Sequence, residues 1–275
     1  MNPKKWQKNL AFCFIVFMLL LSYLPIIVLV VFSFTEISAG RTGFSFEAYR
    51  NMADSSEIWR AALNTVILAT SSALIATVLG AFAAIGIFNM KSKTARTAMS
   101  GANQIPVVNP DIVTGVSIML LFAALSDIGV RFNNEWFRLI IGHTIITTPF
   151  AVLAIMPRLR QLNPNVYEAA LDLGATPFKA TVKVLLPQLL PAMLAAFALA
   201  FTLSLDDFVV TQYNNLDIDT ISTYIYKTLT TRAGKDQDAV RAFSAILFVV
   251  VMGILMLINI KSIKTHKHNR AAKKK

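Results

Sequence analysis

The chain has 275 residues, of which 55% are hydrophobic and only 15% are charged, a composition that argues against an ordinary soluble domain with a single core. Its formal net charge is +11, but the Lys and Arg residues are clustered and do not line one face with interleaved aromatic side chains, which disfavours nucleic-acid binding. The single cysteine, Cys13, excludes an intrachain disulfide and a cysteine-based metal site. We therefore expect an all-α polytopic membrane protein.

Six apolar stretches are long enough to cross the hydrocarbon core of a bilayer, which takes about 20 helical residues. They cover residues 12–34, 65–88, 105–125, 139–156, 185–205 and 242–260. The first is too long for the apolar part of a cleaved signal peptide, so we expect it to remain as a helix. The expected organisation is an N-terminal tail, first helix and outer loop (1–60), a transmembrane domain (61–260) and a basic cytoplasmic tail (261–275).

The distribution of positive charge predicts the orientation. With both termini in the cytoplasm, most of the 26 Lys and Arg residues fall on the cytoplasmic side, as the positive-inside rule requires. Much of this excess comes from the tail, 261–275. We therefore predict a multi-pass protein of the cytoplasmic membrane with both termini inside the cell.

Three aspartates stand out because charge is costly inside a membrane. Asp111 lies within the third stretch, and Asp206 and Asp207 directly follow the outer end of the fifth. Pro106 and Pro110 precede Asp111 and should break the helix, which is tolerated where backbone lines a cavity or is buried in protein. Counted along a continuous helix from the start of the stretch, Asp111 would lie roughly 9 Å into the core.

The connection between the fourth and fifth stretches contains signals for two short helices. Asn163 is a good N-cap with Pro164 at the first helical position, and Gly174 suits the left-handed residue after a helix end. Thr176 and Pro177 repeat the start signal. We predict a helix, a glycine bend and a second helix.

The first of these helices carries a face suited to contact with another protein. Glu168 and Asp172 are four residues apart, so they share a face and repel each other unless a cationic partner approaches. Ala169 and Ala170 leave room beside them for close contact. A solvated amphipathic connector is the alternative reading of the same residues.

This segment resembles the EAA loop of binding-protein-dependent ABC importer permeases of the MetI-like type. The resemblance is carried by Glu168-Ala169-Ala170, Gly174 and Val184-Leu185-Leu186-Pro187, with Val184 where the family has Ile. It implies a cytoplasmic coupling helix that docks in a cleft of an ATPase subunit. The implied coupling residues are Glu168, Ala169, Ala170, Asp172, Gly174 and Pro187.

Further stretches look like the spermidine/putrescine branch of these permeases. They include Gly43-Phe44-Ser45, Pro110-Asp111-Ile112-Val113 and Leu203-Ser204-Leu205-Asp206-Asp207. The resemblance implies a polyamine importer with Asp111, Asp206 and Asp207 as candidates for the substrate pathway, because a polycation in a low-dielectric passage needs carboxylates. Ordinary capping or interface roles are the alternative for all three. Residues 211–219 depart from the branch, which bears on docking and cargo.

The implied partners are a cytoplasmic ATPase dimer, a second homologous permease and an extracytoplasmic polyamine-binding protein. We expect no catalytic, cofactor or metal site, since the sequence lacks a nucleotide-binding Walker motif and a metal-ligand cluster. Asp206 and Asp207 are adjacent and cannot face each other as a catalytic dyad in a helix. A permease for another small cationic or organic substrate and a stand-alone secondary transporter remain alternatives. His143 is interpreted as an interhelical hydrogen-bond partner.

Overall fold

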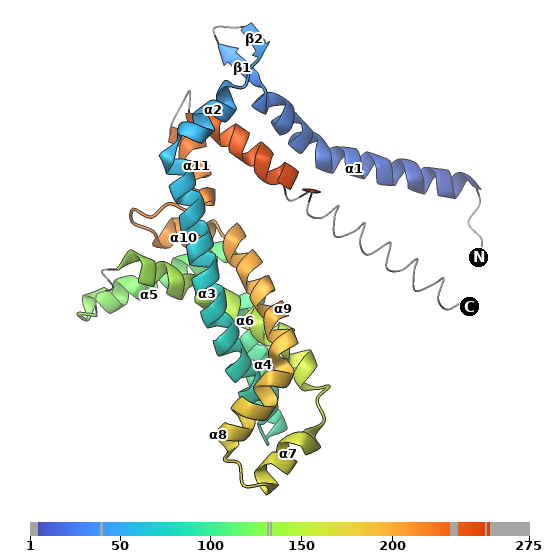
Figure 1. Cartoon of the computed structure of the whole chain (residues 1–275), viewed down its shortest axis with the longest axis vertical. Coiled ribbons are helices and arrows are strands. Elements are labelled where there is room, and N and C mark those ends of the chain that lie inside the picture. Colours follow the sequence, from blue (N-terminus) through green and yellow to red (C-terminus); the bar gives the residue numbers. More distant parts are fainter. Residues whose placement is uncertain are drawn as a thin grey trace. The chain divides into compact units, whose positions relative to one another are not determined.

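The computed structural model describes residues 5–38, 41–130, 132, 134–231, 236–250 and 252–253, and the chain divides into two compact units. One unit contains Met1–Ile58 and Ile225–Lys275, and the other contains Trp59–Tyr224. Figure 1 shows a chain built almost entirely of helices. This confirms the expected all-α class, with one two-stranded ribbon as the only sheet in the described part of the chain.

The first unit holds that ribbon. Its elements are α1 (Lys5–Ser33), β1 (Thr35–Ser38), β2 (Arg41–Phe44) and α2 (Glu47–Asp54), and the N-terminal end of α3 (Ser56–Phe88) belongs to it. The strands pair antiparallel, with Thr35 opposite Phe44. Phe34 stacks on Phe44 with ring centroids 5.9 Å apart and packs against Tyr49 at 4.9 Å. These aromatic contacts hold the ribbon to the start of α2.

The second unit contains most of α3 and the helices that follow it as far as α11. These are α4 (Lys93–Val108), α5 (Asp111–Asp127), α6 (Glu135–Leu159), α7 (Pro164–Asp172), α8 (Pro177–Ala180), the π-helical segment η1 (Thr181–Leu185), α9 (Leu186–Asp206), α10 (Val209–Asn214) and α11 (Ile221–Thr231), which continues into the first unit.

Four of the described helices are long and apolar enough to cross a membrane. They are Asn9–Ser33 within α1, α3, α6, and the continuous helix Pro177–Asp206 that contains α8, η1 and α9. The pair α4 and α5 would add a fifth span, but it is bent by 104°. The sixth predicted stretch, 242–260, lies partly outside the described residues, and the basic tail 261–275 lies wholly outside them. The predicted count of six is therefore not confirmed.

Small residues let α3, α6 and α9 pack closely in the second unit. Their shared core includes Ala84 and Ile85 from α3, Ala151 and Ile155 from α6, and Leu189 from α9. Helices in a membrane associate mainly through such close packing, because lipid tails are as apolar as leucine side chains. The helices approach closely at Gly80, where an added Cβ would lie only 2.7 Å from the Cβ of Ala151.

We predict that Gly80→Ala destabilises this packing, because α3 and α6 must separate to admit the methyl group. The purified protein should unfold at a temperature several degrees lower, as measured by thermal melting in detergent. Gly86→Ala is the matched control, since Gly86 lies in the same helix with open space around its Cβ position. Equal melting temperatures for the two variants would contradict the close approach.

Candidate functional site

The third predicted stretch is broken at Asn109 and Pro110. The residue before a proline is driven out of the helical region, and Asn109 has an extended backbone with ψ 138°. Pro110 then precedes the first turn of α5, and its carbonyl accepts a hydrogen bond from Val113 N–H at 3.0 Å. The predicted break is confirmed, and because α4 and α5 meet at 104°, Asp111 does not lie on one continuous helix with the start of the third stretch.

A second break follows α9. Asp207 is extended, with ψ 124°, and α10 begins two residues later. One carboxylate oxygen of Asp207 accepts from Val210 N–H at 3.3 Å, and the other accepts from Thr211 N–H at 3.0 Å. Asp207 therefore satisfies amides at the start of α10, which membrane burial would otherwise leave without partners.

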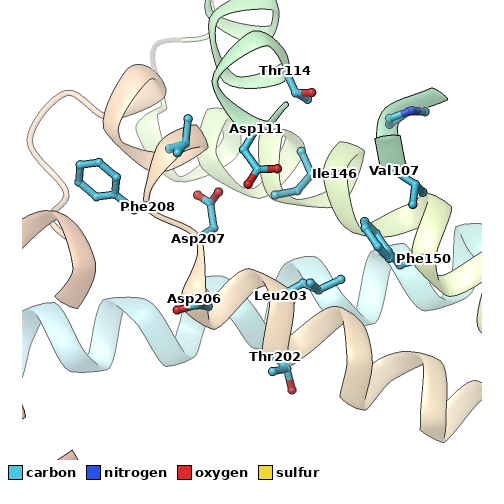
Figure 2. Close-up of a pocket in the computed structure, with 12 residues that line it drawn as sticks. Val107, Asp111, Thr114, Ile146, Phe150, Thr202, Leu203, Asp206, Asp207 and Phe208 are labelled. Atoms are coloured by element: carbon cyan, nitrogen blue, oxygen red, sulfur yellow. The ribbon is translucent and has the colours of Figure 1, made fainter. Parts of the chain in front are cut away.

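The two breaks bring the three predicted aspartates to one cavity of about 290 Å³. Figure 2 shows Asp111 and Asp207 with their carboxylates directed into the same space. Asp111 and Asp206 are exposed, and Asp207 is half-buried. The remaining lining is apolar or hydroxyl-bearing: Pro106, Val107, Thr114, Ile146, Phe150, Thr202, Leu203, Phe208 and Val209. We call this cavity the acidic pocket.

The electrostatics of the acidic pocket favour a cationic occupant. None of its lining residues is Lys, Arg or His, so three carboxylates share a small cavity with no positive charge in the lining. Like charges in a low-dielectric setting repel, and a cation between them relieves both the repulsion and the cost of desolvation. The described residues contain no group of three His, Cys, Asp or Glu side chains that could hold a metal ion.

His143 lies directly behind the pocket wall and is fully buried. Its Nδ1 is 2.7 Å from Ser204 Oγ on α9, and its Nε2 is 2.9 Å from Thr211 Oγ1 on α10. The interpretation of His143 as an interhelical hydrogen-bond partner is confirmed. Its Nε2 also lies 3.4 Å from the Asp207 carboxylate, a contact that no pattern in the sequence predicts.

The predicted helix, glycine bend and second helix are all present. The side chain of Asn163 caps α7 by accepting from Asn165 N–H at 3.1 Å. Gly174 has φ +85°, and Gly174 N–H and Ala175 N–H donate to the carbonyls of Leu171 and Ala170, which is the Schellman arrangement. Thr176 then caps α8.

Most of the predicted coupling residues gather on this exposed segment. Glu168, Ala169, Asp172 and Gly174 are exposed, while Ala170 is half-buried. Pro187 lies apart from them, in the first turn of α9 beyond η1. Within the described residues, neither carboxylate has a hydrogen bond or an ion pair, so the face is available to a partner.

The π-helical segment η1 was not predicted, and Pro187 explains its position. Proline has no N–H to donate back along the helix, so the regular series of backbone hydrogen bonds is interrupted one turn before Pro187. Leu186 N–H donates to the carbonyl of Thr181 with π spacing, and the side chain of Gln188 donates to the carbonyl of Val184 at 3.0 Å. These bonds keep the join between α8 and α9 continuous.

Glu135 is a further residue that sequence reasoning missed. It lies in the first turn of α6, and its Oε1 accepts from the backbone N–H groups of Leu216, Asp217 and Ile218 at 2.5, 2.8 and 2.8 Å. The carboxylate thus fixes the loop between α10 and α11. No sequence signal marks this contact, because the partners are backbone groups about 80 residues away.

The family of the chain follows from comparison with known proteins. A model described as the binding-protein-dependent transport system inner membrane component matches residues 76–264. The spermidine/putrescine transport system permease protein PotC of Haemophilus influenzae is 30% identical over 255 residues, which is 92% of this chain and 96% of that protein. The putrescine transport system permease protein PotI of Escherichia coli is 32% identical over 194 residues, 70% of this chain and 69% of that protein.

Solved structures share the fold. A bacterial ABC transporter involved in the import of the acidic polysaccharide alginate has a chain with TM-score 0.64 and 22% identity, and the match covers 94% of this chain and 95% of that one. The methionine ABC transporter MetNI in an inward-facing conformation gives TM-score 0.56 and 16% identity, over 75% of this chain and 94% of that one.

The fold and the family match together define a multi-pass, non-catalytic transport component of the cell membrane. The chain belongs to the family of binding-protein-dependent transport system inner membrane components, the permeases of ABC importers. It therefore works in an importer assembly with a binding protein and an ATPase.

We predict that Glu135→Ala loosens the loop at 216–218, because three amides lose their common acceptor. Hydrogen–deuterium exchange followed by mass spectrometry should show at least tenfold faster exchange in peptides covering this loop. Glu168→Ala serves as the control, since Glu168 lies on the separate α7. Unchanged exchange in the Glu135 variant would contradict this anchoring.

Proposed function

We propose that this chain is the permease subunit that passes polyamines, spermidine or putrescine, into the cell, with energy from a separate ATPase subunit. The observation that carries the proposal is the acidic pocket, in which Asp111, Asp206 and Asp207 share a lining with no cationic side chain. A polyamine carries several ammonium groups, and each needs an anionic partner once it leaves water. The names of the relatives PotC and PotI support the same cargo class.

The charge of the acidic pocket also favours a different cargo from that of the structural neighbour. That neighbour belongs to a transporter involved in importing an acidic polysaccharide. Three carboxylates without a positive counterpart in the lining would repel a polyanion, so the shared fold does not carry over its cargo. A different small organic cation is the alternative that the pocket itself would accept.

Within the assembly, we place both termini and the segment 163–187 on the cytoplasmic side, as the distribution of Lys and Arg favours. The coupling residues Glu168, Ala169, Ala170, Asp172 and Gly174 would then contact an ATPase dimer, with Pro187 stiffening the connection to α9. A second homologous permease would complete the passage. An extracytoplasmic polyamine-binding protein would deliver cargo from the other side.

The first test of this proposal is uptake of labelled spermidine and putrescine by cells that lack the gene, rescued with variants of this chain. We expect Asp111→Asn to lower uptake at least tenfold while the protein stays in the membrane, because the pocket loses an exposed carboxylate. Asp127→Asn is the matched control, since Asp127 ends the same helix and does not line the pocket.

Two outcomes would contradict the proposal. Rescue by the Asp111 variant equal to that by wild type would remove Asp111 from the substrate pathway. No uptake defect in cells without the gene would reject polyamines as the cargo.

The second test concerns the ATPase contact. Gly174→Val should reduce the amount of ATPase subunit that co-purifies with the permease, because a β-branched residue does not tolerate φ +85° and the end of α7 must rearrange. Gly174→Asn is the matched control, since Asn adopts this conformation more readily. Equal retention of the ATPase by the two variants would argue against a role of this bend in docking.

A further inference from the structure

The three carboxylates of the acidic pocket are held in different ways. Asp207 accepts from Val210 N–H, Thr211 N–H and Thr211 Oγ1, the last at 3.2 Å. Asp111 and Asp206 are exposed and have no hydrogen bond or ion pair within the described residues. One carboxylate is therefore fixed in the wall, and two are free to reorient.

The hydrogen-bond directions around Asp207 define the part that His143 plays. A carboxylate only accepts, so the Thr211 hydroxyl donates its one proton to Asp207. Thr211 Oγ1 must then accept from His143, which requires a proton on Nε2. The same Nε2 is 3.4 Å from the Asp207 carboxylate. His143 thus holds the Asp207 carboxylate in two ways, through the Thr211 hydroxyl and through its own Nε2, which lies close to the carboxylate.

The other ring nitrogen of His143, Nδ1, contacts side chains in the core between the helices. Nδ1 of His143 is 2.7 Å from Ser204 Oγ, which is 3.0 Å from Ser72 Oγ. These groups come from α6, α9 and α3, and all are buried. The ring is held at Nδ1 by Ser204 of α9 and at Nε2 by Thr211 of α10, so both of its nitrogens are fixed by side chains from packed helices.

We propose that His143 is a positioning residue for cargo, which holds Asp207 as the one pre-oriented carboxylate of the acidic pocket. This inference rests on the proposed function. A fixed anion binds an ammonium group without first losing side-chain entropy, and the free Asp111 and Asp206 adjust to the remaining charges of the cargo. Asp207 and His143 would therefore determine affinity, while the free pair would accommodate polyamines of different length.

Two substitutions of His143 distinguish the role of Nε2 from that of Nδ1. His143→Gln places an amide donor near the position of Nε2 and preserves support of Thr211 and Asp207. His143→Asn reaches only the position of Nδ1 and loses that support. In the purified permease–ATPase complex without binding protein, we expect His143→Asn to weaken binding of labelled spermidine about tenfold and His143→Gln about twofold or less.

The control for a merely structural effect is the ATPase rate of the same complexes without cargo, which should not differ between the two variants. His143→Asn should also have no further effect on affinity when Asp207→Asn is already present, but should retain its full effect in an Asp206→Asn background. Equal affinities of the Asn and Gln variants, or additive effects with Asp207→Asn, would overturn the inference.

If neither His143 variant assembles with the ATPase, Thr211→Val tests the proposed positioning of Asp207 instead. It removes the bridging hydroxyl at nearly constant volume and should weaken spermidine binding as His143→Asn would. Unchanged affinity of a folded Thr211→Val complex would overturn the inference.

Failure of the proposed cargo would give a different result. If the wild-type complex binds neither spermidine nor putrescine, the polyamine assignment is wrong. The anchoring of Asp207 is then tested by thermal melting of the single and double variants of His143 and Asp207. Non-additive shifts support the anchoring, and additive shifts reject it.

Discussion

A helix inside a membrane can be interrupted only where other groups of the protein satisfy the backbone donors and acceptors that the break releases. The described part of the chain has two such interruptions at the acidic pocket, and the arrangement of the pocket depends on them. Asn109 and Pro110 turn α5 away from α4. After α9, the Asp207 carboxylate accepts hydrogen bonds from backbone N–H groups at the start of α10. After the first break α5 begins at Asp111, and before the second break α9 ends at Asp206, so both breaks bring aspartates to one cavity.

The short helix α10 is seated by contacts that leave little freedom. Asn214 Nδ2 donates to the carbonyl of Gly115 at 3.2 Å, so α10 is joined to α5. A Cβ at Gly142 would lie 3.0 Å from Val210, so α6 also approaches closely. Glu135 holds the loop that follows. The polar bonds and the close packing together keep the wall of the pocket rigid, which a pre-oriented carboxylate requires.

One continuous helix joins the two candidate sites. The helix Pro177–Asp206 starts at the exposed bend around Gly174 and ends at the acidic pocket. Its only irregular turn is η1, where Pro187 removes a backbone donor and Gln188 supplies a side-chain donor instead. In the importer we propose, movement of α7 on the ATPase would reach Asp206 along this helix. The π-helical segment η1 lies near the start of this helix, so the movement would pass through η1 before it reaches α9.

Local chemistry in the sequence was enough to predict several features. Asn163, Gly174 and Thr176 act through their own backbone and near neighbours, so the helix, bend and second helix were predicted correctly. The break before Asp111 follows from proline chemistry in the same way. The apolar stretches predicted helices because membrane burial demands them.

Only the tertiary structure decided what depends on distant residues. That Asp111 lies in the same pocket as Asp206 and Asp207 depends on the angles of two breaks, which no local pattern encodes. The contact of His143 with Asp207 and that of Glu135 with the loop at 216–218 join residues 64 or more positions apart. Such contacts are determined by how helices pack, because a buried polar group takes whichever partner the packing brings within reach.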